Sequence, residues 1–487
     1  MSNNPIRRLA GETAIYGLGT IIPRLLNYFL VPFYTRVFDR GEYGQITELY
    51  AWVAILMVIL TYGMETSFFR YAELEKQATK VFNTATTMLL VTSGLFLLLV
   101  SLFFGRIAQG IQYEGHSEYI LILAAVVALD AFSSIPFAYL RYLNKARRFS
   151  TIKIISVVVN VVLNLVFILL IPKALGGNPE QLWIYRKTDL IGFVFVANLI
   201  STSMALLMLY PELKKLRIGI DPALLRKMLI YGLPILVIGI AGMINEVSDK
   251  ILLKYLLPDR STAEAQIGIY GANYKLAILM MLFIQMFRYA AEPFFFRESE
   301  NKDAKVIYSK VMTYFVIFTW LIFLGVMLYI EVFKYFIGPA FWVGLKIVPI
   351  VLAAKLFLGV FYNLSVWYKL TNKTMYGAII ALVGAAITIA LNIVLIPRLG
   401  YMGSAWANFI CYLFIMLVSY FWGQRVYNVK YNLKKVGGYS LLAIALYLVS
   451  LSLNGIPLAY QIVFNTLLIV LYVAVVIRQE RKNLNLT

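Results

Sequence analysis

Charged residues are scarce in this chain, at only 14% of its 487 residues, whereas 61% are apolar. A soluble protein carries about a quarter charged residues and under half apolar ones. An apolar fraction this large cannot be buried inside a water-soluble globule of this length. The composition therefore predicts an all-α, polytopic integral membrane protein.

Cysteine and histidine are almost absent, with Cys411 and His116 as the sole examples. One cysteine excludes a disulfide framework, and one histidine excludes paired-histidine metal centres and histidine relays. The chain also lacks a glycine-rich loop that ends in Gly-Lys-Ser/Thr, so we expect no ATP bound in the usual way. We therefore expect no metal and no cofactor, and expect uphill work to draw on an ion gradient, the membrane potential or a partner.

Long apolar runs fill most of the remaining sequence. Runs of about 18 or more residues predict transmembrane helices, and we count fourteen. They span residues 13–35, 43–70, 81–104, 118–140, 151–172, 189–210, 226–253, 266–295, 308–330, 342–367, 376–397, 402–423, 438–453 and 457–477. Every connecting loop is short, which leaves no room for a soluble catalytic domain.

The net charge of +20 follows the predicted topology. The segments on the side that holds both termini carry 28 lysines and arginines, and those on the other side carry 10. The positive-inside rule therefore predicts that both termini are cytoplasmic, as are Arg141–Lys153, Pro211–Lys227 and Arg425–Lys435. Because topology accounts for the positive charge, we expect no nucleic-acid partner.

The chain repeats itself at an offset of 227 residues. Residues 43–70 and 270–297 share eight identities without a gap, including Glu65 with Glu292 and Arg70 with Arg297. The repeat predicts an N-terminal six-helix half at residues 1–212, a C-terminal half at 213–428, and two additional helices with a tail at 429–487. Six helices per half make the repeat parallel, which is typical of transporters whose substrate site lies between two halves.

Charged side chains inside predicted spans are costly and usually face a cavity or a partner. They lie mainly on three repeat-related pairs of helices, the first with the seventh, the second with the eighth and the fourth with the tenth. Several of them could have a purely structural role. Glu246 and Lys250 are four residues apart, as are Arg288 and Glu292, so each pair could neutralise itself. Glu48 and Lys346 could reach the membrane surface. The full set of charged residues inside the predicted spans is Arg24, Glu48, Glu65, Asp130, Glu246, Asp249, Lys250, Lys275, Arg288, Glu292, Lys346 and Lys355.

Four of these charges lie deep in a span without an opposite charge at helical spacing, namely Arg24, Asp130, Lys275 and Lys355. We expect them to line a translocation path. Glu65 and Glu292 lie about one turn from Arg70 and Arg297, so a gate or a packing ion pair is at least as plausible there as a substrate contact.

Several short motifs point to a known family. They are Glu42-Tyr43-Gly44, the stretch from Gly63 to Arg70, Gly268-Ile269-Tyr270, Asp249-Lys250, and the Leu-Asn pairs followed by Ile-Pro and a base. Together with the predicted 6+6+2 arrangement, these resemble the polysaccharide-biosynthesis flippases. The resemblance is to the O-antigen-type, Wzx-like branch of the multidrug/oligosaccharidyl-lipid/polysaccharide exporter superfamily, which moves undecaprenyl-pyrophosphate-linked oligosaccharides.

The resemblance implies a V-shaped transporter fold like that of the multidrug and toxin extrusion (MATE) proteins. Its basic cavity residues would hold the substrate's pyrophosphate, a role that Arg24 and Lys275 match by position, with Lys355 the next candidate. Asp130 or Asp249 could bind a coupling cation such as Na+ or H+.

We therefore expect a flippase rather than an enzyme, multi-pass in the bacterial cytoplasmic membrane. It would act on a lipid-linked polysaccharide repeat unit among the membrane lipids, together with polysaccharide polymerase machinery, in O-antigen or lipopolysaccharide synthesis. The alternatives are a lipid II flippase and a drug/cation antiporter of the same fold. A membrane polymerase or glycosyltransferase is disfavoured because it usually needs a large external loop.

Overall fold

The apolar runs of the sequence form long helices. The computed structural model describes residues 19, 21–75, 77–299, 301–371, 373–452 and 455–484, and in these ranges it contains no strand. Thirteen helices of the described residues are long and apolar enough to cross a membrane. They match the second to fourteenth predicted spans, so the predicted all-α polytopic fold is confirmed. Of the first predicted span, 13–35, residues 13–18 and 20 lie outside the described residues, as do Arg7, Arg8 and the last three residues of the chain.

Packing divides the chain into two compact units. The first comprises Met1–Leu30 and Leu49–Met243, and the second comprises Val31–Glu48 and Ile244–Thr487. This division follows contacts rather than the internal repeat, so the domain boundaries at 212 and 428 remain a prediction. Two helices pass from one unit into the other, α3 (Arg40–Thr61) and α12 (Pro222–Leu256).

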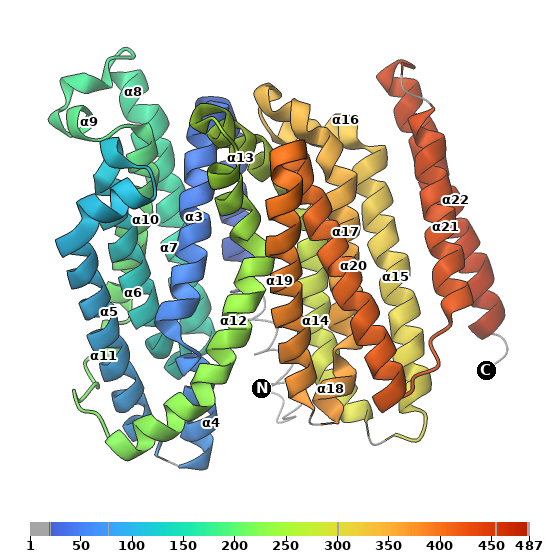
Figure 1. The fold of residues 1–487 in the computed structure, drawn as a ribbon, viewed down its shortest axis with the longest axis horizontal. Coiled ribbons are helices and arrows are strands. Elements are labelled where there is room, and N and C mark those ends of the chain that lie inside the picture. Colours follow the sequence, from blue (N-terminus) through green and yellow to red (C-terminus); the bar gives the residue numbers. More distant parts are fainter. Residues whose placement is uncertain are drawn as a thin grey trace. The chain divides into compact units, whose positions relative to one another are not determined.

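In the first unit, α5, α6, α7 and α10 run side by side (Figure 1). Its helices are α4 (Met64–Leu74), α5 (Ala78–Gly110), α6 (Ser117–Tyr142), α7 (Ala146–Leu165), α8 (Ile171–Ala174), α9 (Trp183–Lys187), α10 (Leu190–Met208) and α11 (Tyr210–Leu213). Three short turns accompany them, η1 (Glu114–His116), η2 (Val166–Leu170) and η3 (Pro179–Gln181).

In the second unit, α17 and α20 form a packed pair flanked by α15 and α19, and α21 and α22 pack on α15. The helices are α2 (Leu30–Val37), α13 (Arg260–Lys275), α14 (Ile278–Glu298), α15 (Ala304–Leu328), α16 (Ile330–Phe333), α17 (Val348–Leu364), α18 (Val366–Leu370), α19 (Thr374–Leu399), α20 (Tyr401–Val426), α21 (Leu433–Leu451) and α22 (Leu458–Leu484). Two 3-10 helices are η4 (Lys334–Phe336) and η5 (Pro339–Ile347).

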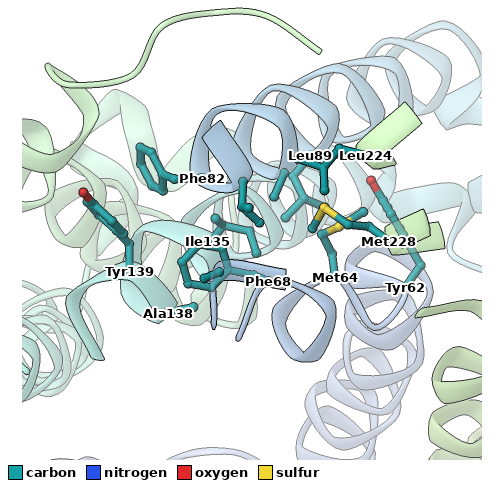
Figure 2. Packing of buried hydrophobic residues seen from close by; sticks show 13 residues of the cluster. Tyr62, Met64, Phe68, Phe82, Leu89, Ile135, Ala138, Tyr139, Leu224 and Met228 are labelled. Carbon is teal, nitrogen blue, oxygen red and sulfur yellow. The ribbon is translucent and has the colours of Figure 1, made fainter. Parts of the chain in front are cut away.

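Close packing holds the helices of each unit together, because lipid tails are as apolar as the side chains themselves and burial alone gives little driving force. Figure 2 shows the packing of α4, α5, α6 and α12 in the first unit, where Phe68 is fully buried and the ring of Phe82 stacks on that of Tyr139 at 4.4 Å. A second cluster joins α17, α19 and α20 around Tyr412 and Cys411.

Both repeat-related long spans are broken. The predicted span 43–70 divides into α3 and α4 at Tyr62 and Gly63, whose φ angles are 31° and 71°. The predicted span 266–295 divides into α13 and α14 at Leu276 and Ala277. These breaks do not lie at repeat-equivalent positions, so the two halves have diverged in the helices that carry the strongest sequence repeat.

Gly44, from the first Tyr-Gly motif of the repeat, and Gly268, three residues before the glycine of the second, lie where α3 crosses α13 within the second unit. A Cβ atom at Gly44 would lie 1.9 Å from the carbonyl oxygen of Glu264, and one at Gly268 would lie 1.9 Å from that of Arg40. Such distances are sterically impossible, so the crossing requires glycine at both positions. Small residues at this point allow the two backbones to touch, as is usual between membrane helices.

Candidate functional site

Charged side chains from several helices converge inside the second unit. Glu246, Asp249 and Lys250 come from α12, Lys275 from the end of α13, and Lys355 from α17. Tyrosines of α13 and α20 surround them. We refer to these five charged residues as the C-terminal charge cluster.

Glu246 and Lys355 form the ion pair at the centre of this cluster. The Lys355 Nζ lies 2.7 and 3.0 Å from the two carboxylate oxygens of Glu246. The hydroxyls of Tyr274 and Tyr412 each donate to the same carboxylate at 3.0 Å. The Lys355 side chain is 0% exposed, whereas that of Glu246 is 29% exposed. Lys355 therefore supports the site in this conformation and is not open to a ligand.

A second pair lies one turn further along α12. The Lys250 Nζ contacts Asp249 Oδ1 at 2.9 Å and the Glu246 carbonyl oxygen at 3.0 Å. Asp249 Oδ2 accepts from the Tyr270 hydroxyl at 2.6 Å and from Asn408 at 3.4 Å. The sequence expectation that Glu246 and Lys250 neutralise each other is thus replaced by two separate carboxylate–lysine pairs.

Lys275 gives the cluster its excess positive charge. With Glu246 paired to Lys355 and Asp249 to Lys250, three lysines face two carboxylates, and Lys275 takes part in neither pair. Its side chain is exposed and interacts electrostatically with Lys250 and Glu246. Lys275 also precedes the first turn of α14, whose N-terminus carries the positive end of the helix dipole. The arrangement is therefore suited to hold an anion.

The same unit buries another ion pair near the start of α3. Lys254 Nζ lies 2.8 Å from Glu48 Oε2, and both side chains are 0% exposed. The expectation that Glu48 reaches the membrane surface is therefore wrong, because the carboxylate has a buried partner. Lys254, which the sequence places in a loop, lies within α12.

Glu65 and Glu292 pair with bases on neighbouring helices rather than with Arg70 or Arg297. Glu65 of α4 pairs with Arg141 of α6 in the first unit, and Glu292 of α14 pairs with Lys369 of α18 in the second. Arg141 and Lys369 are themselves related by the repeat, at an offset of 228. Each ion pair links two helices within a single unit.

Asp130 lies on α6 in the first unit and is half-buried. Lys153 of α7 acts on it electrostatically with the opposite charge, and Thr202 of α10 is within reach of a hydrogen bond to it. The Lys153 ammonium in turn lies 3.9 Å from the centre of the Phe137 ring. The carboxylate thus has a lysine partner in its own unit, one that helical spacing along α6 does not reveal.

Arg24 lies in the helical segment of residues 21–28 and is exposed. It belongs to the first unit, whereas Lys275 belongs to the second. Their joint action on one substrate stays a prediction.

Sequence reasoning missed the tyrosines of the cluster and the role of Glu246. Tyr270, Tyr274 and Tyr412 are indistinguishable by sequence from the many other tyrosines of the chain. One available signal is that Tyr270 and Tyr274 are four residues apart, which puts both on the same face of α13.

A family profile described as polysaccharide biosynthesis protein matches residues 9–299. Because the match covers more than half of the chain, the protein belongs to this family. A comparison with curated proteins returned no match.

Solved structures share the fold. A lipid II flippase MurJ in an inward closed conformation is 16% identical, with a TM-score of 0.73 over 96% of this chain and 99% of that chain. The MATE multidrug transporter DinF-BH is 18% identical, with a TM-score of 0.63 over 88% and 97%. An inward-facing MATE-family multidrug resistance transporter of the MOP superfamily is 14% identical, with a TM-score of 0.62 over 87% and 98%. The chain is therefore a multi-pass membrane protein with the fold of these transporters.

Proposed function

We propose that this protein moves an undecaprenyl-pyrophosphate-linked oligosaccharide, a polysaccharide repeat unit, from the cytoplasmic to the outer leaflet by alternating access. The observation that carries this proposal is the C-terminal charge cluster, which has one more lysine than carboxylates. An uncompensated positive charge inside a membrane protein marks a ligand path. The family match to polysaccharide biosynthesis proteins supports the substrate class.

The pyrophosphate of such a substrate must exchange its water for protein groups. Lys275 supplies a compact positive charge beside the start of α14, and Arg24 supplies a planar guanidinium from the other unit. Charge-assisted hydrogen bonds of this kind contribute about 1.5–3 kcal/mol each. Lys355 would join them only if the substrate displaced Glu246 from it, so we rank it behind the other two.

A lipid II flippase is the second candidate, and one observation favours it. The MurJ structure matches 96% of this chain, whereas the MATE transporters match 87–88%. The additional length shared with MurJ agrees with a fold that handles a lipid-linked substrate. The substrates of both candidate flippases carry an undecaprenyl pyrophosphate, so the charge cluster would serve either function. A drug/cation antiporter would have no use for its excess lysine.

Energy would come from an ion gradient or the membrane potential. Asp130, with Lys153 and Thr202, and Asp249, with Lys250 and Tyr270, are the carboxylates that could exchange a lysine partner for Na+ or H+. Binding of a cation would then bias one conformation over another. If so, Asp130→Asn or Asp249→Asn should remove the gradient dependence of transport in vesicles. Unchanged dependence in both variants would exclude this coupling.

Transport in proteoliposomes tests the proposal. Purified protein would be offered fluorescent undecaprenyl-pyrophosphate oligosaccharide, lipid II, or a cationic dye, with and without an ion gradient. We expect flipping of the oligosaccharide lipid, its loss in Lys275→Ala, and normal rates in the matched control Lys214→Ala, a loop lysine. Faster transport of lipid II would favour the second candidate, and export of the dye alone would overturn the proposal.

We further propose that the protein lies in the bacterial cytoplasmic membrane with both termini in the cytoplasm, beside the polymerase that consumes its product. Accumulation of lipid-linked repeat units inside a deletion strain with normal polymerase activity in extracts would agree with this. Normal surface polysaccharide in that strain would contradict it.

A further inference from the structure

A basic cavity lies in the second unit, away from the C-terminal charge cluster. Its volume is about 840 Å³, and it opens beside the first turns of α15, the connection from α20 to α21, and the end of α22. It is lined by Lys305, Val306, Ser309, Lys310, Thr313, Tyr314, Asn428, Lys430, Asn432, Lys435 and Glu480.

Positive charge dominates this cavity, since four lysines face one carboxylate. That carboxylate, Glu480, already has partners, because it accepts from Lys435 at 2.8 Å and from the Tyr439 hydroxyl at 2.7 Å. Lys310 and Lys430 are exposed and form no ion pair with a described residue. The cavity therefore presents positive charge that no described acidic group offsets.

Two helices begin at the cavity wall and add to this potential. The lining residues Lys305 and Val306 lie in the first turn of α15, and Asn432 caps α21, with its side chain accepting from the Lys435 amide at 3.0 Å. Both helices are long, so each presents the positive end of its dipole here. Ser309 holds the wall in place by donating to the Lys430 carbonyl oxygen at 2.9 Å.

The cavity also runs along α15, which is one of the helices long and apolar enough to cross a membrane. From Lys305 to Tyr314 it follows α15 through nine residue-to-residue steps, a rise of about 13 Å along the helix axis. Val306 and Tyr314 are exposed on this wall, at 54% and 39%. A cavity in which lysines lie beside exposed apolar side chains matches a molecule with a charged head and an apolar body. Free phosphate would use the rim only.

We propose that this cavity binds the phosphate headgroup of an anionic phospholipid, with the glycerol and the start of the acyl chains along the α15 wall. The site is distinct from the proposed substrate site and does not depend on it. It lies on the side that the positive-residue distribution predicts to be cytoplasmic. Lys310 and Lys430 contact the phosphate, and Lys305, 4.7 Å above the Tyr427 ring, completes the positive rim.

Thermal unfolding of the full chain in neutral detergent tests the proposal. Cys411 is free and 1% exposed, so a thiol-reactive fluorescent dye reports its exposure on unfolding. We expect phosphatidylglycerol to raise the melting temperature and phosphatidylcholine to leave it unchanged. The double variant Lys310→Ala/Lys430→Ala should need at least tenfold more phosphatidylglycerol for the same shift, since each lysine at a membrane surface contributes to anionic-lipid binding.

Two controls distinguish this site from general charge effects and from free phosphate. Lys214→Ala/Lys215→Ala removes the same charge from exposed positions outside the cavity and should respond as the wild type does. An equal loss in that control, or equal stabilisation by inorganic phosphate at matched concentration, would overturn the lipid site. Native mass spectrometry provides a second readout, in which the wild type retains phosphatidylglycerol and the cavity variant does not.

Discussion

Single charged residues of this chain gain their partners from other helices. Glu246 and Lys355 are 109 positions apart in the sequence and lie on different helices. Spacing along one helix therefore does not predict this ion pair. Depth in an apolar run, together with the lack of an opposite charge at helical spacing, singles out Arg24, Asp130, Lys275 and Lys355 in the sequence. Which carboxylate meets which lysine depends on how helices pack, and helical periodicity does not encode that.

The Glu246–Lys355 pair yields an asymmetric prediction. Glu246→Gln leaves the wholly buried Lys355 ammonium without its counter-charge, which should destabilise the fold by about 3 kcal/mol or more. Lys355→Met should cost less, because Glu246 is partly exposed and keeps two tyrosine donors. The double variant Glu246→Gln/Lys355→Met should recover most of the loss.

Denaturation in detergent, with ligand absent, measures these three variants. Lys227→Ala is the matched control, because it breaks an ion pair with Glu75 in which the two side chains are 59% and 39% exposed, and it should cost under about 1 kcal/mol. If the double variant were as unstable as the sum of the single ones, the two side chains would not be coupled.

At the level of elements, the helix breaks were not predictable from hydropathy. The stretch 43–70 is apolar enough to be predicted as one continuous span despite Glu48 and Glu65, and Gly63 looks like any other glycine in a membrane helix. Gly63 adopts a left-handed conformation, with φ at 71°, and a Cβ atom there would lie 2.5 Å from the Gly232 carbonyl oxygen. The left-handed backbone conformation and the close approach of α12 both require glycine at this position. Neither feature can be recognised from the local sequence.

Gly63→Ala should therefore destabilise the protein by about 1 kcal/mol or more, from backbone strain together with the contact to Gly232. Gly94→Ala, in the middle of α5 with open space around it, should instead be neutral or stabilise slightly. Melting temperatures of the two variants measure the difference. Equal effects would show that α3 and α4 do not need the break.

The start of α13 gives a prediction on pH. Asp259 caps this helix, and hydrogen bonds from the Thr262 hydroxyl and then the Thr262 amide lower its pKa to about 2. A carboxylate with a lowered pKa stabilises the fold above its unfolded pKa, and that stabilisation is lost as the pH falls toward the folded pKa. Asp259→Ala should lower the melting temperature at neutral pH, and the difference from wild type should shrink between about pH 4 and pH 2.

Asp303→Ala is the matched control for this cap. Asp303 also precedes a helix, but its side chain makes no cap hydrogen bond. We expect a smaller change in melting temperature, with little dependence on pH in the same range. An equal response of both variants would mean that the Asp259 hydrogen bonds do not stabilise α13.

At the level of the whole molecule, the thirteen spans among the described residues, and their order, could be predicted from the sequence because lipid selects long apolar helices so strongly. The internal repeat also corresponds to features of the structure. Its Tyr-Gly positions lie where α3 crosses α13, and its acids Glu65 and Glu292 pair with repeat-related bases. The sequence did not reveal which part of α3 packs with the second unit, because that depends on contacts between segments that are distant in the sequence.

The predicted topology can be tested on single cysteines in a Cys411→Ala background. Arg147 and Asn178 are both exposed, so each position is open to a reagent. In intact cells, a membrane-impermeant thiol reagent should label cysteine at 178 and spare cysteine at 147, because the latter is predicted to be cytoplasmic. The opposite pattern would invert the topology and the proposed direction of transport.

The central claim is that the excess lysine of the C-terminal charge cluster binds the pyrophosphate of the substrate. The most direct measurement is the affinity of purified protein for undecaprenyl pyrophosphate itself, in wild type, Lys275→Ala and Lys275→Arg, with melting temperatures recorded on the same samples. We predict that Lys275→Ala weakens binding about tenfold or more at an unchanged melting temperature, and that Lys275→Arg recovers part of the loss. Full affinity in Lys275→Ala, or a loss explained by a lower melting temperature, would contradict the claim.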